Sequence, residues 1–202
     1  MSATGEWFDR RILVTGGTSG IGLAVARAFS AAGGNVHVTG LTDDEVERCR
    51  GEFPEFQVST LDVSRDDDVA KRVGAMPSLD VLVNCAGMIL RDGQEFDPEK
   101  FQRVVDVNLT GTMRVSTACR PLLAASHGSI VNIASMLSFF GSGFAPAYSS
   151  SKGGISQLTK SLAIAWAKDG IRVNAVAPGW IETPLTQPLT DDAAKRQAII
   201  DR

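Results

Sequence analysis

Two residues with the spacing to support acid–base chemistry are Tyr148 and Lys152, which stand in the segment YSSSK with only serines between them. On an α-helix, positions i and i+4 lie on one face, so the phenol and the ammonium would be neighbours. Ile155, Leu162 and Trp166 continue the same stripe at helical spacing, which predicts that the pair faces the protein interior. A buried lysine without a partner is costly, so this pattern favours a functional role over a structural one.

A cation beside a phenol changes the acidity of that phenol. A free tyrosine titrates near ~10, which is too high for efficient proton exchange at neutral pH. An ammonium about 6 Å away, at an effective dielectric constant of about 20, favours the phenolate by roughly 3 kcal/mol, or about two pKa units. The sequence therefore predicts that Lys152 lowers the pKa of Tyr148 and makes it a usable acid or base.

A second segment of chemical interest is VTGGTSGIG, residues 14–22, which follows a predicted strand and opens a predicted helix. Its glycines, Gly16, Gly20 and Gly22, have the spacing G-x-x-x-G-x-G instead of the G-x-G-x-x-G dinucleotide fingerprint. Glycine permits a tight turn and close backbone approach, and a helix N-terminus offers unpaired N–H groups to a pyrophosphate. Such a loop can also be an ordinary turn, but its place after the first strand favours dinucleotide binding.

Short apolar runs alternate with longer helical patterns along the chain. This predicts βαβ units and a doubly wound, Rossmann-type parallel sheet with helices on both faces. Thr42 with Glu45 predicts a capping box, and Asp97 before Pro98 predicts the N-cap of one long helix that runs to about Ala125. The predicted strands are residues 11–15, 35–39, 56–59, 79–84, 129–133 and 172–177.

Length and composition limit the functions open to the chain. At 202 residues it is most simply one domain over residues 1–202, and a net charge of −3 argues against nucleic-acid binding, which needs clustered Lys and Arg. No run reaches the roughly 18 apolar residues of a membrane span, and the N-terminus shows no signal peptide. The three cysteines and two histidines lack metal-ligand spacing, so we expect no metal site, and reduced thiols fit a cytoplasmic protein.

In their order along the chain, these motifs resemble those of the classical short-chain dehydrogenase/reductase family over essentially the whole length. Each motif is short, but their joint order and spacing argue against coincidence. The shared motifs are TGGTSGIG at 15–22, Asp62 after the third strand, NCAG at 84–87, Asn108 in NLTG, Ser135, the Tyr148–Lys152 pair, and Pro178–Gly179 followed by Thr183.

The resemblance implies an oxidoreductase that transfers a hydride between NAD or NADP and a ketone or secondary alcohol. Tyr148 would be the general acid or base, Lys152 would also bind the nicotinamide ribose, and Ser135 would polarise the substrate oxygen. Asn108 would hold a water that links Lys152 to solvent, or it could satisfy a local backbone group. By the same resemblance, residues 62–63 would contact the adenine, 84–87 the adenosine ribose and 178–183 the nicotinamide. The residues assigned to the cofactor are Gly16, Ser19, Gly20, Ile21, Gly22, Leu41, Asp62, Val63, Asn84, Ala86, Gly87, Tyr148, Lys152, Pro178, Gly179, Ile181 and Thr183.

The choice between NAD and NADP depends on the end of the second strand, VHVTGLTDD. Members that use NAD generally place an acid there, whereas members that use NADP supply Arg or Lys. Gly40 stands at the place of the acid, Leu41 at that of the common arginine, and Ser19 where many NADP enzymes carry a basic residue. Asp43 and Asp44 would repel a 2′-phosphate, or they simply complement the helix dipole. We expect NAD rather than NADP.

The substrate, a small carbonyl or alcohol molecule, would contact residues 88–90, 136–144 and 180–187, which are largely apolar. These segments are similar to those of family members that act on sugar acids and polyols, and also to 3-oxoacyl thioester reductases. Residues 180–202 would form a lid that ends in a helix at 191–202. Family members usually continue with a seventh strand, so we expect that segment to be absent here and the sixth strand to be an exposed edge.

Other function classes stay open at this point. A non-catalytic dinucleotide-binding sensor is the main alternative, although the complete set of four candidate catalytic residues favours an enzyme. Epimerases and dehydratases of the extended relatives rank last, because those chains are normally longer. The resemblance also implies a homodimer or homotetramer packed through the long helix and the Tyr148 helix, where small residues would permit close approach: Ser149, Ser150, Gly153 and Gly154.

Overall fold

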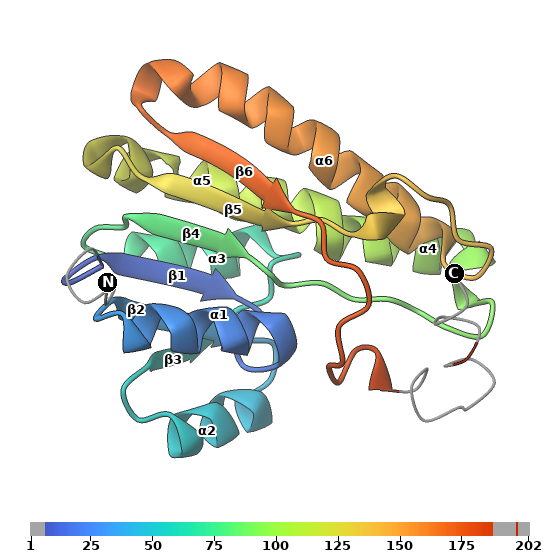
Figure 1. Cartoon of the computed structure of the whole chain (residues 1–202), viewed down its shortest axis with the longest axis horizontal. Coiled ribbons are helices and arrows are strands. Elements are labelled where there is room, and N and C mark those ends of the chain that lie inside the picture. The colour runs from blue at the N-terminus through green and yellow to red at the C-terminus, as the bar shows by residue number, and fades with distance from the viewer. Residues whose placement is uncertain (1–6, 188–196, 198–202) are drawn as a thin grey trace.

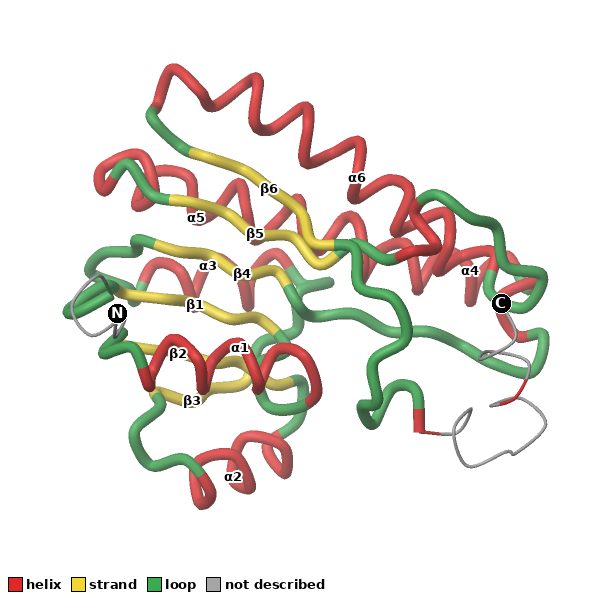
Figure 2. The backbone as a smooth tube through the Cα atoms, in the orientation of Figure 1, coloured by secondary structure: helices red, strands yellow, loops and turns green. Residues whose placement is uncertain are grey.

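Six parallel strands form the sheet of this computed structural model, which describes residues 7–187 and residue 197 (Figures 1 and 2). Their order is β3-β2-β1-β4-β5-β6, so the direction of winding reverses between β1 and β4. This confirms the predicted doubly wound α/β fold, and each predicted strand is present with bounds shifted by at most two residues. The strands are β1 Arg11–Thr15, β2 Asn35–Gly40, β3 Gln57–Thr60, β4 Val81–Asn84, β5 Ser129–Ile133 and β6 Arg172–Val176.

Helices connect the strands and cover both faces of the sheet. The α-helices are α1 Gly20–Ala31, α2 Asp43–Glu52, α3 Asp66–Gly74, α4 Pro98–Val105, α5 Gly111–Ser126 and α6 Pro146–Trp166. Short helical turns are η1 Gln94–Phe96, η2 Asp106–Thr110, η3 Met136–Ser138 and η4 Ala167–Asp169. In Figure 1, α1 lies in front of the strands and α3 and α5 lie behind them.

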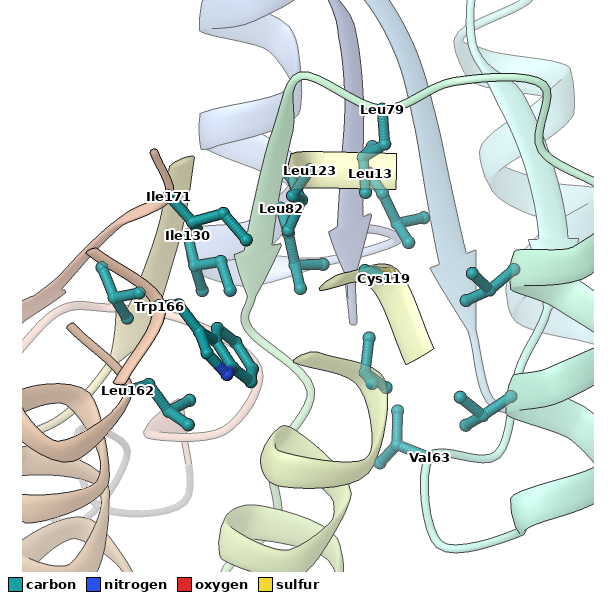
Figure 3. Packing of buried hydrophobic residues seen from close by; sticks show 14 of the residues in the cluster. Leu13, Val63, Leu79, Leu82, Cys119, Leu123, Ile130, Leu162, Trp166 and Ile171 are labelled. Atoms are coloured by element: carbon teal, nitrogen blue, oxygen red, sulfur yellow. The ribbon is translucent and has the colours of Figure 1, made fainter. Parts of the chain in front are cut away.

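The core consists of two apolar layers, one on each side of the sheet. Successive side chains of a strand point to opposite faces, so Leu13 of β1 packs in the layer under α3, α5 and α6, while Ile12 and Val14 pack under α1 and α2. Figure 3 shows the first layer, where Trp166 of α6 lies beside Ile130 and Leu162. The α6 stripe is therefore buried, as its periodicity predicts.

The long helix expected from Pro98 to about Ala125 is interrupted. Asp97 caps α4 as predicted, and its carboxylate accepts from the backbone N–H groups of Glu99 and Lys100, both at 3.0 Å. Between α4 and α5, however, η2 is a π-helical turn that carries Asn108. Such turns are rare in regular helices and frequent at functional sites.

Within the described residues, β6 is the last strand at one edge of the sheet, and Val176 is half exposed there. None of the helices among residues 7–187 and 197 combines the length and apolar character that a membrane crossing needs. Within those same residues, no group of His, Cys, Asp and Glu side chains could hold a metal ion. The helix predicted at 191–202, and most of the predicted lid, lie outside the described residues.

Candidate active site

A cleft of about 560 Å³ opens at the carboxyl ends of β1, β2 and β4, where the winding of the sheet reverses. Parallel α/β sheets bind ligands at this kind of position, because the loops that follow neighbouring strands diverge there. The arrowheads in Figure 1 point toward this edge. The glycine turn forms one wall of the cleft, and Tyr148 and Lys152 of α6 belong to the other.

The glycine turn has a backbone that side chains would disrupt. Gly16 and Gly20 have φ values of 62° and 52°, in the left-handed region that favours glycine. A Cβ on Gly16 would lie 2.7 Å from Cα of Ala86, and one on Gly22 would lie 2.2 Å from the Gly16 oxygen. Ser19 precedes α1 without capping it through its side chain. The first N–H groups of α1 are thus available to an anion, and the residues present fit a dinucleotide pyrophosphate.

Most residues that the resemblance assigns to the cofactor line this cleft, but four do not. Asn84 is buried and donates to Ser116 Oγ and Asn132 Oδ1, both at 2.9 Å, so its side chain holds the sheet to α5 instead of facing the adenosine-ribose position. Pro178, Gly179 and Ile181 also lie away from the cleft surface. The assigned residues that line it are Gly16, Ser19, Gly20, Ile21, Gly22, Leu41, Asp62, Val63, Ala86, Gly87, Tyr148, Lys152 and Thr183.

Tyr148 and Lys152 lie side by side on the inward face of α6. The Lys152 ammonium lies 5.6 Å from the centroid of the Tyr148 ring, close to the separation expected from the sequence. Lys152 is 5% exposed, and its Nζ donates to the Ile133 carbonyl at 2.6 Å. Burial lowers the pKa of Lys152 to about 8, because the interior disfavours the charged form.

The acidity of Tyr148 differs from the sequence prediction. Burial raises the pKa of Tyr148, and the hydrogen bond from Ser135, which favours the phenolate, does not offset this rise. Coulomb interactions with Cys85 and Glu95 raise the pKa of Tyr148 further. The prediction that Lys152 brings about a net lowering is therefore wrong for this structure: the burial that weakens the ammonium also penalises the phenolate.

Ser135 and Asn108 do not line the cleft themselves, but each contacts a residue that does. Ser135 caps η3 by accepting from Leu137 N at 3.1 Å, besides its hydrogen bond to Tyr148. Asn108 satisfies local backbone, since it accepts from Met88 N at 2.8 Å and donates to Met88 O at 2.9 Å. A Cβ on Gly87 would lie 3.3 Å from Asn108 Oδ1 and 3.8 Å from Lys152 Nζ, so both polar groups lie beside Gly87, which lines the cleft.

Glu45 is a cleft residue that the sequence analysis interpreted only as a helix cap. Thr42 Oγ1 accepts from Glu45 N at 3.3 Å, as predicted, but the Glu45 carboxylate accepts from Leu41 N at 2.7 Å and not from Thr42 N. Because it bonds Leu41 N and not Thr42 N, the Glu45 carboxylate lies over Gly40. A Cβ added to Gly40 would lie 3.0 Å from Glu45 Oε2. Asp43 and Asp44, by contrast, are exposed and outside the cleft.

Glu95 is a second functional candidate that the sequence did not single out. It is fully buried, and its two oxygens accept from Leu90 N and Tyr148 N, each at 2.9 Å. It stands in the polar segment RDGQEFDPEK, in which nothing marks one acid as buried. A carboxylate so close to the Tyr148 backbone could have been found only from the folded arrangement.

The proposed substrate walls contribute unevenly to the cleft. Met88, Thr183 and Leu185 line it, and Arg91 Nη2 donates to the Leu185 carbonyl at 2.5 Å, which joins the loop after β4 to the segment after β6. The three phenylalanines of residues 139–144 are instead 64–77% exposed. The lid can be followed only as far as residue 187.

Comparisons with known proteins identify strong similarity over nearly the whole chain. The family model for short chain dehydrogenases matches residues 10–194. A 2-dehydro-3-deoxy-D-gluconate 5-dehydrogenase of Bacillus subtilis is 40% identical over 201 residues, 94% of this chain and 78% of that protein. The crystal structure of gox2181 is similar with a TM-score of 0.91 and 31% identity, over 96% of this chain and 80% of that one.

A further solved structure is informative about the cofactor. It is described as a proposed NAD(P)-dependent gluconate 5-dehydrogenase from Beutenbergia cavernae, with NADP bound at low occupancy. Its TM-score is 0.88 at 35% identity, over 96% of this chain and 82% of that one. The comparison supports a nicotinamide dinucleotide in this fold without deciding between NAD and NADP for the present chain.

The acidity of Tyr148 can be measured directly, because it is the single tyrosine in the sequence. In a titration followed by tyrosinate absorbance, we expect a midpoint above the ordinary value of ~10, since burial raises the pKa of Tyr148. Ser135→Ala removes a hydrogen bond that favours the phenolate, so its midpoint should be higher still. Ser150→Ala, an exposed serine on the same helix, should match the wild type. A wild-type midpoint below that of free tyrosine, in protein that remains folded by circular dichroism, contradicts this account.

Proposed function

Because the chain belongs to the short-chain dehydrogenase family, it is an oxidoreductase that acts on CH–OH groups with NAD or NADP, and we propose that its substrate is a sugar acid. The observation that carries this proposal is the 40% identity to a 2-dehydro-3-deoxy-D-gluconate 5-dehydrogenase over 94% of the chain. The structure described above as a proposed gluconate 5-dehydrogenase, at 35% identity, agrees with the same substrate class.

Tyr148 is the proton donor when the carbonyl substrate is reduced. The phenol is protonated at neutral pH, as a tyrosine of ordinary pKa also is, and this is the form that donates to the developing alkoxide oxygen. Burial raises the pKa of Tyr148 and so makes the phenol a weaker acid. Ser135, hydrogen-bonded to Tyr148, orients the same substrate oxygen. In the oxidation direction Tyr148 must first lose its proton, and the ammonium of Lys152 stabilises the resulting phenolate across 5.6 Å.

A nicotinamide dinucleotide bound in the cleft would supply the hydride for reduction or accept it in oxidation. The glycine turn and the first N–H groups of α1 would hold its pyrophosphate. Asp62, Val63 and Lys152 line the cleft. Asp62 and Val63 would lie against the adenine, and Lys152 would bind the nicotinamide ribose. Asn108 fixes the backbone of Met88 beside Gly87, which keeps this wall of the cleft in place.

The cofactor that the cleft favours is NAD, and the residue responsible is Glu45. Its carboxylate lies at the end of β2, beside Gly40 and Leu41, where a ribose 2′-substituent would approach. A carboxylate can accept hydrogen bonds from ribose hydroxyls, whereas a 2′-phosphate would be repelled. Arg103 is the cation that lines the cleft besides Lys152, and it comes from α4 and not from the loop after β2.

A homodimer or homotetramer is the assembly that we propose. Ile164 of α6 is 80% exposed and Met113 of α5 is 38% exposed, and a partner would remove this apolar surface from water. Gly154, expected to face the partner, instead packs within the chain, since a Cβ there would lie 2.6 Å from Leu109 Cδ2. The interface therefore uses the outer side of α6.

Replacing Tyr148 by Phe tests the enzymatic function. The variant lacks the proton donor but keeps the ring, so turnover should fall by roughly 10²–10⁴-fold. NADH binding, followed by its fluorescence, should stay within about 2-fold, because the glycine turn is unaltered. The assay uses a panel of sugar acids and their ketones with both cofactors. A wild-type protein that binds NADH without turning over any substrate of the panel would favour the sensor alternative.

Replacing Glu45 by Gln tests the cofactor preference. The wild type should have a higher kcat/KM with NADH than with NADPH. In the variant, the ratio of kcat/KM with NADH to kcat/KM with NADPH should be about tenfold lower. This corresponds to the loss of about 1.4 kcal/mol of repulsion between the carboxylate and the 2′-phosphate. Asp44→Asn, an exposed acid one position away, should leave the ratio unchanged. The assignment of Glu45 to NAD preference is rejected if the ratio is the same in wild type and in Glu45→Gln. It is also rejected if the wild type prefers NADPH.

Light scattering tests the assembly. The measured mass should be two or four times the 21.4 kDa of one chain. Ile164→Arg places a charge in the proposed interface and should shift the mass toward the monomer, whereas Arg172→Ala at the start of β6 should not. A wild type that is strictly monomeric at all concentrations removes the proposal.

A further inference from the structure

The buried charged side chains in the part of the chain that the structure describes are Glu95 and Lys152, and both contact Tyr148. The Lys152 ammonium lies against the ring at 5.6 Å. Glu95 Oε2 accepts from the backbone N–H of Tyr148 at 2.9 Å. Lys152 already has a proposed part in the chemistry, whereas Glu95 has none.

The local chain path brings Glu95 inward from a polar segment. Asp92 and Gly93 both have positive φ values, 55° and 75°, which reverse the chain after Arg91. Gln94 N then donates to Arg91 O at 3.1 Å, and η1 follows. Because η1 packs against the first turns of α6, the Glu95 side chain meets the N-terminus of that helix.

A fully buried carboxylate is costly unless hydrogen bonds compensate for its lost hydration. Glu95 has two charge-assisted bonds, and the positive end of the α6 dipole adds to them. The two donors belong to different segments: Leu90 follows β4 and borders the substrate side, while Tyr148 stands in the first turn of α6. One carboxylate thus fixes the distance between these two parts of the active site.

We propose that Glu95 is a positioning residue of the active site, whose carboxylate holds the first turn of α6 against the loop after β4 and so sets the position of the Tyr148 hydroxyl. This inference rests on the proposed function of Tyr148 as proton donor. It differs from a general packing role, because both oxygens bond backbone atoms of segments that line the reaction centre.

The charge of Glu95 has a second, electrostatic effect. A negative charge beside a phenol disfavours the phenolate, and Glu95 accordingly raises the pKa of Tyr148. The other titratable groups acting on this site are Cys85 after β4, which raises the pKa of Tyr148, and Lys152 on the same helix, while Ser135 hydrogen-bonds the phenol. Glu95 therefore makes the Tyr148 phenol a weaker acid.

Two variants separate position from charge. Glu95→Gln removes the charge and leaves one acceptor oxygen for two N–H donors, so kcat should fall roughly ten- to a hundredfold, with KM for NADH within about 2-fold. Its tyrosinate midpoint should move to lower pH. Glu95→Asp keeps the charge but is too short to bond both segments, so kcat should fall while the midpoint stays near that of the wild type. Glu99→Gln, an exposed acid at the start of α4, is the matched control.

The outcomes distinguish this inference from the proposed function. The inference is overturned if Glu95→Gln has the same kcat and the same tyrosinate midpoint as the control Glu99→Gln. A loss of activity explained by a lower unfolding temperature and an equal rise in KM for NADH, with an unmoved midpoint, also overturns it, since that is a purely structural role. A wild type without turnover counts against the proposed function. The titration needs no substrate, so it remains informative in that case. An unmoved tyrosinate midpoint in Glu95→Gln would then still reject the effect of Glu95 on Tyr148.

Discussion

The hydrogen bond from Lys152 Nζ to the Ile133 carbonyl, 2.6 Å long, joins α6 to the end of β5 inside the protein. A buried ammonium needs such a partner, and it obtains one only if α6 presents this face to the carboxyl end of the sheet. With Lys152 fixed, Tyr148 one turn earlier must face the cleft, and Ser135 after β5 comes within reach of the phenol. The position of one lysine thereby determines the geometry of the reaction centre.

A network of neutral polar side chains supports this arrangement from below. Asn84 of β4 donates to Asn132 of β5, and Asn132 donates to Thr159 of α6, each at 2.9 Å. Asn84 also donates to Ser116 of α5. The network connects two central strands with two helices immediately beneath the cleft, so the ends of these strands and the helix that carries Tyr148 form one unit.

The sequence predicted the parts of the site that depend on local periodicity and on glycine. The i, i+4 spacing placed Tyr148 and Lys152 on the inner face of α6, and the strand–glycine–helix pattern predicted the turn at residues 16–22. It did not predict features created by tertiary contact. Glu45 was recognised as a cap, but its carboxylate bonds Leu41 N, one residue earlier than expected, and so reaches the cleft. Glu95 stands in a polar segment of the sequence in which nothing marks it as buried. The expected acidity of Tyr148 was wrong because spacing gives the distance to a charge and says nothing about desolvation.

The order of the strands has a consequence for how the chain folds. Every strand pairing is parallel. β1 pairs with β4, although β2 and β3 lie between these two strands in the sequence. The first three strands can associate early with their own helices, but Gly16 meets Ala86 only once β4 has joined β1. Closing that long loop before its contacts form costs chain entropy, which slows the step. The cleft is consequently a late product of folding, and a growing polypeptide has no binding site until the strand that completes it has been synthesised.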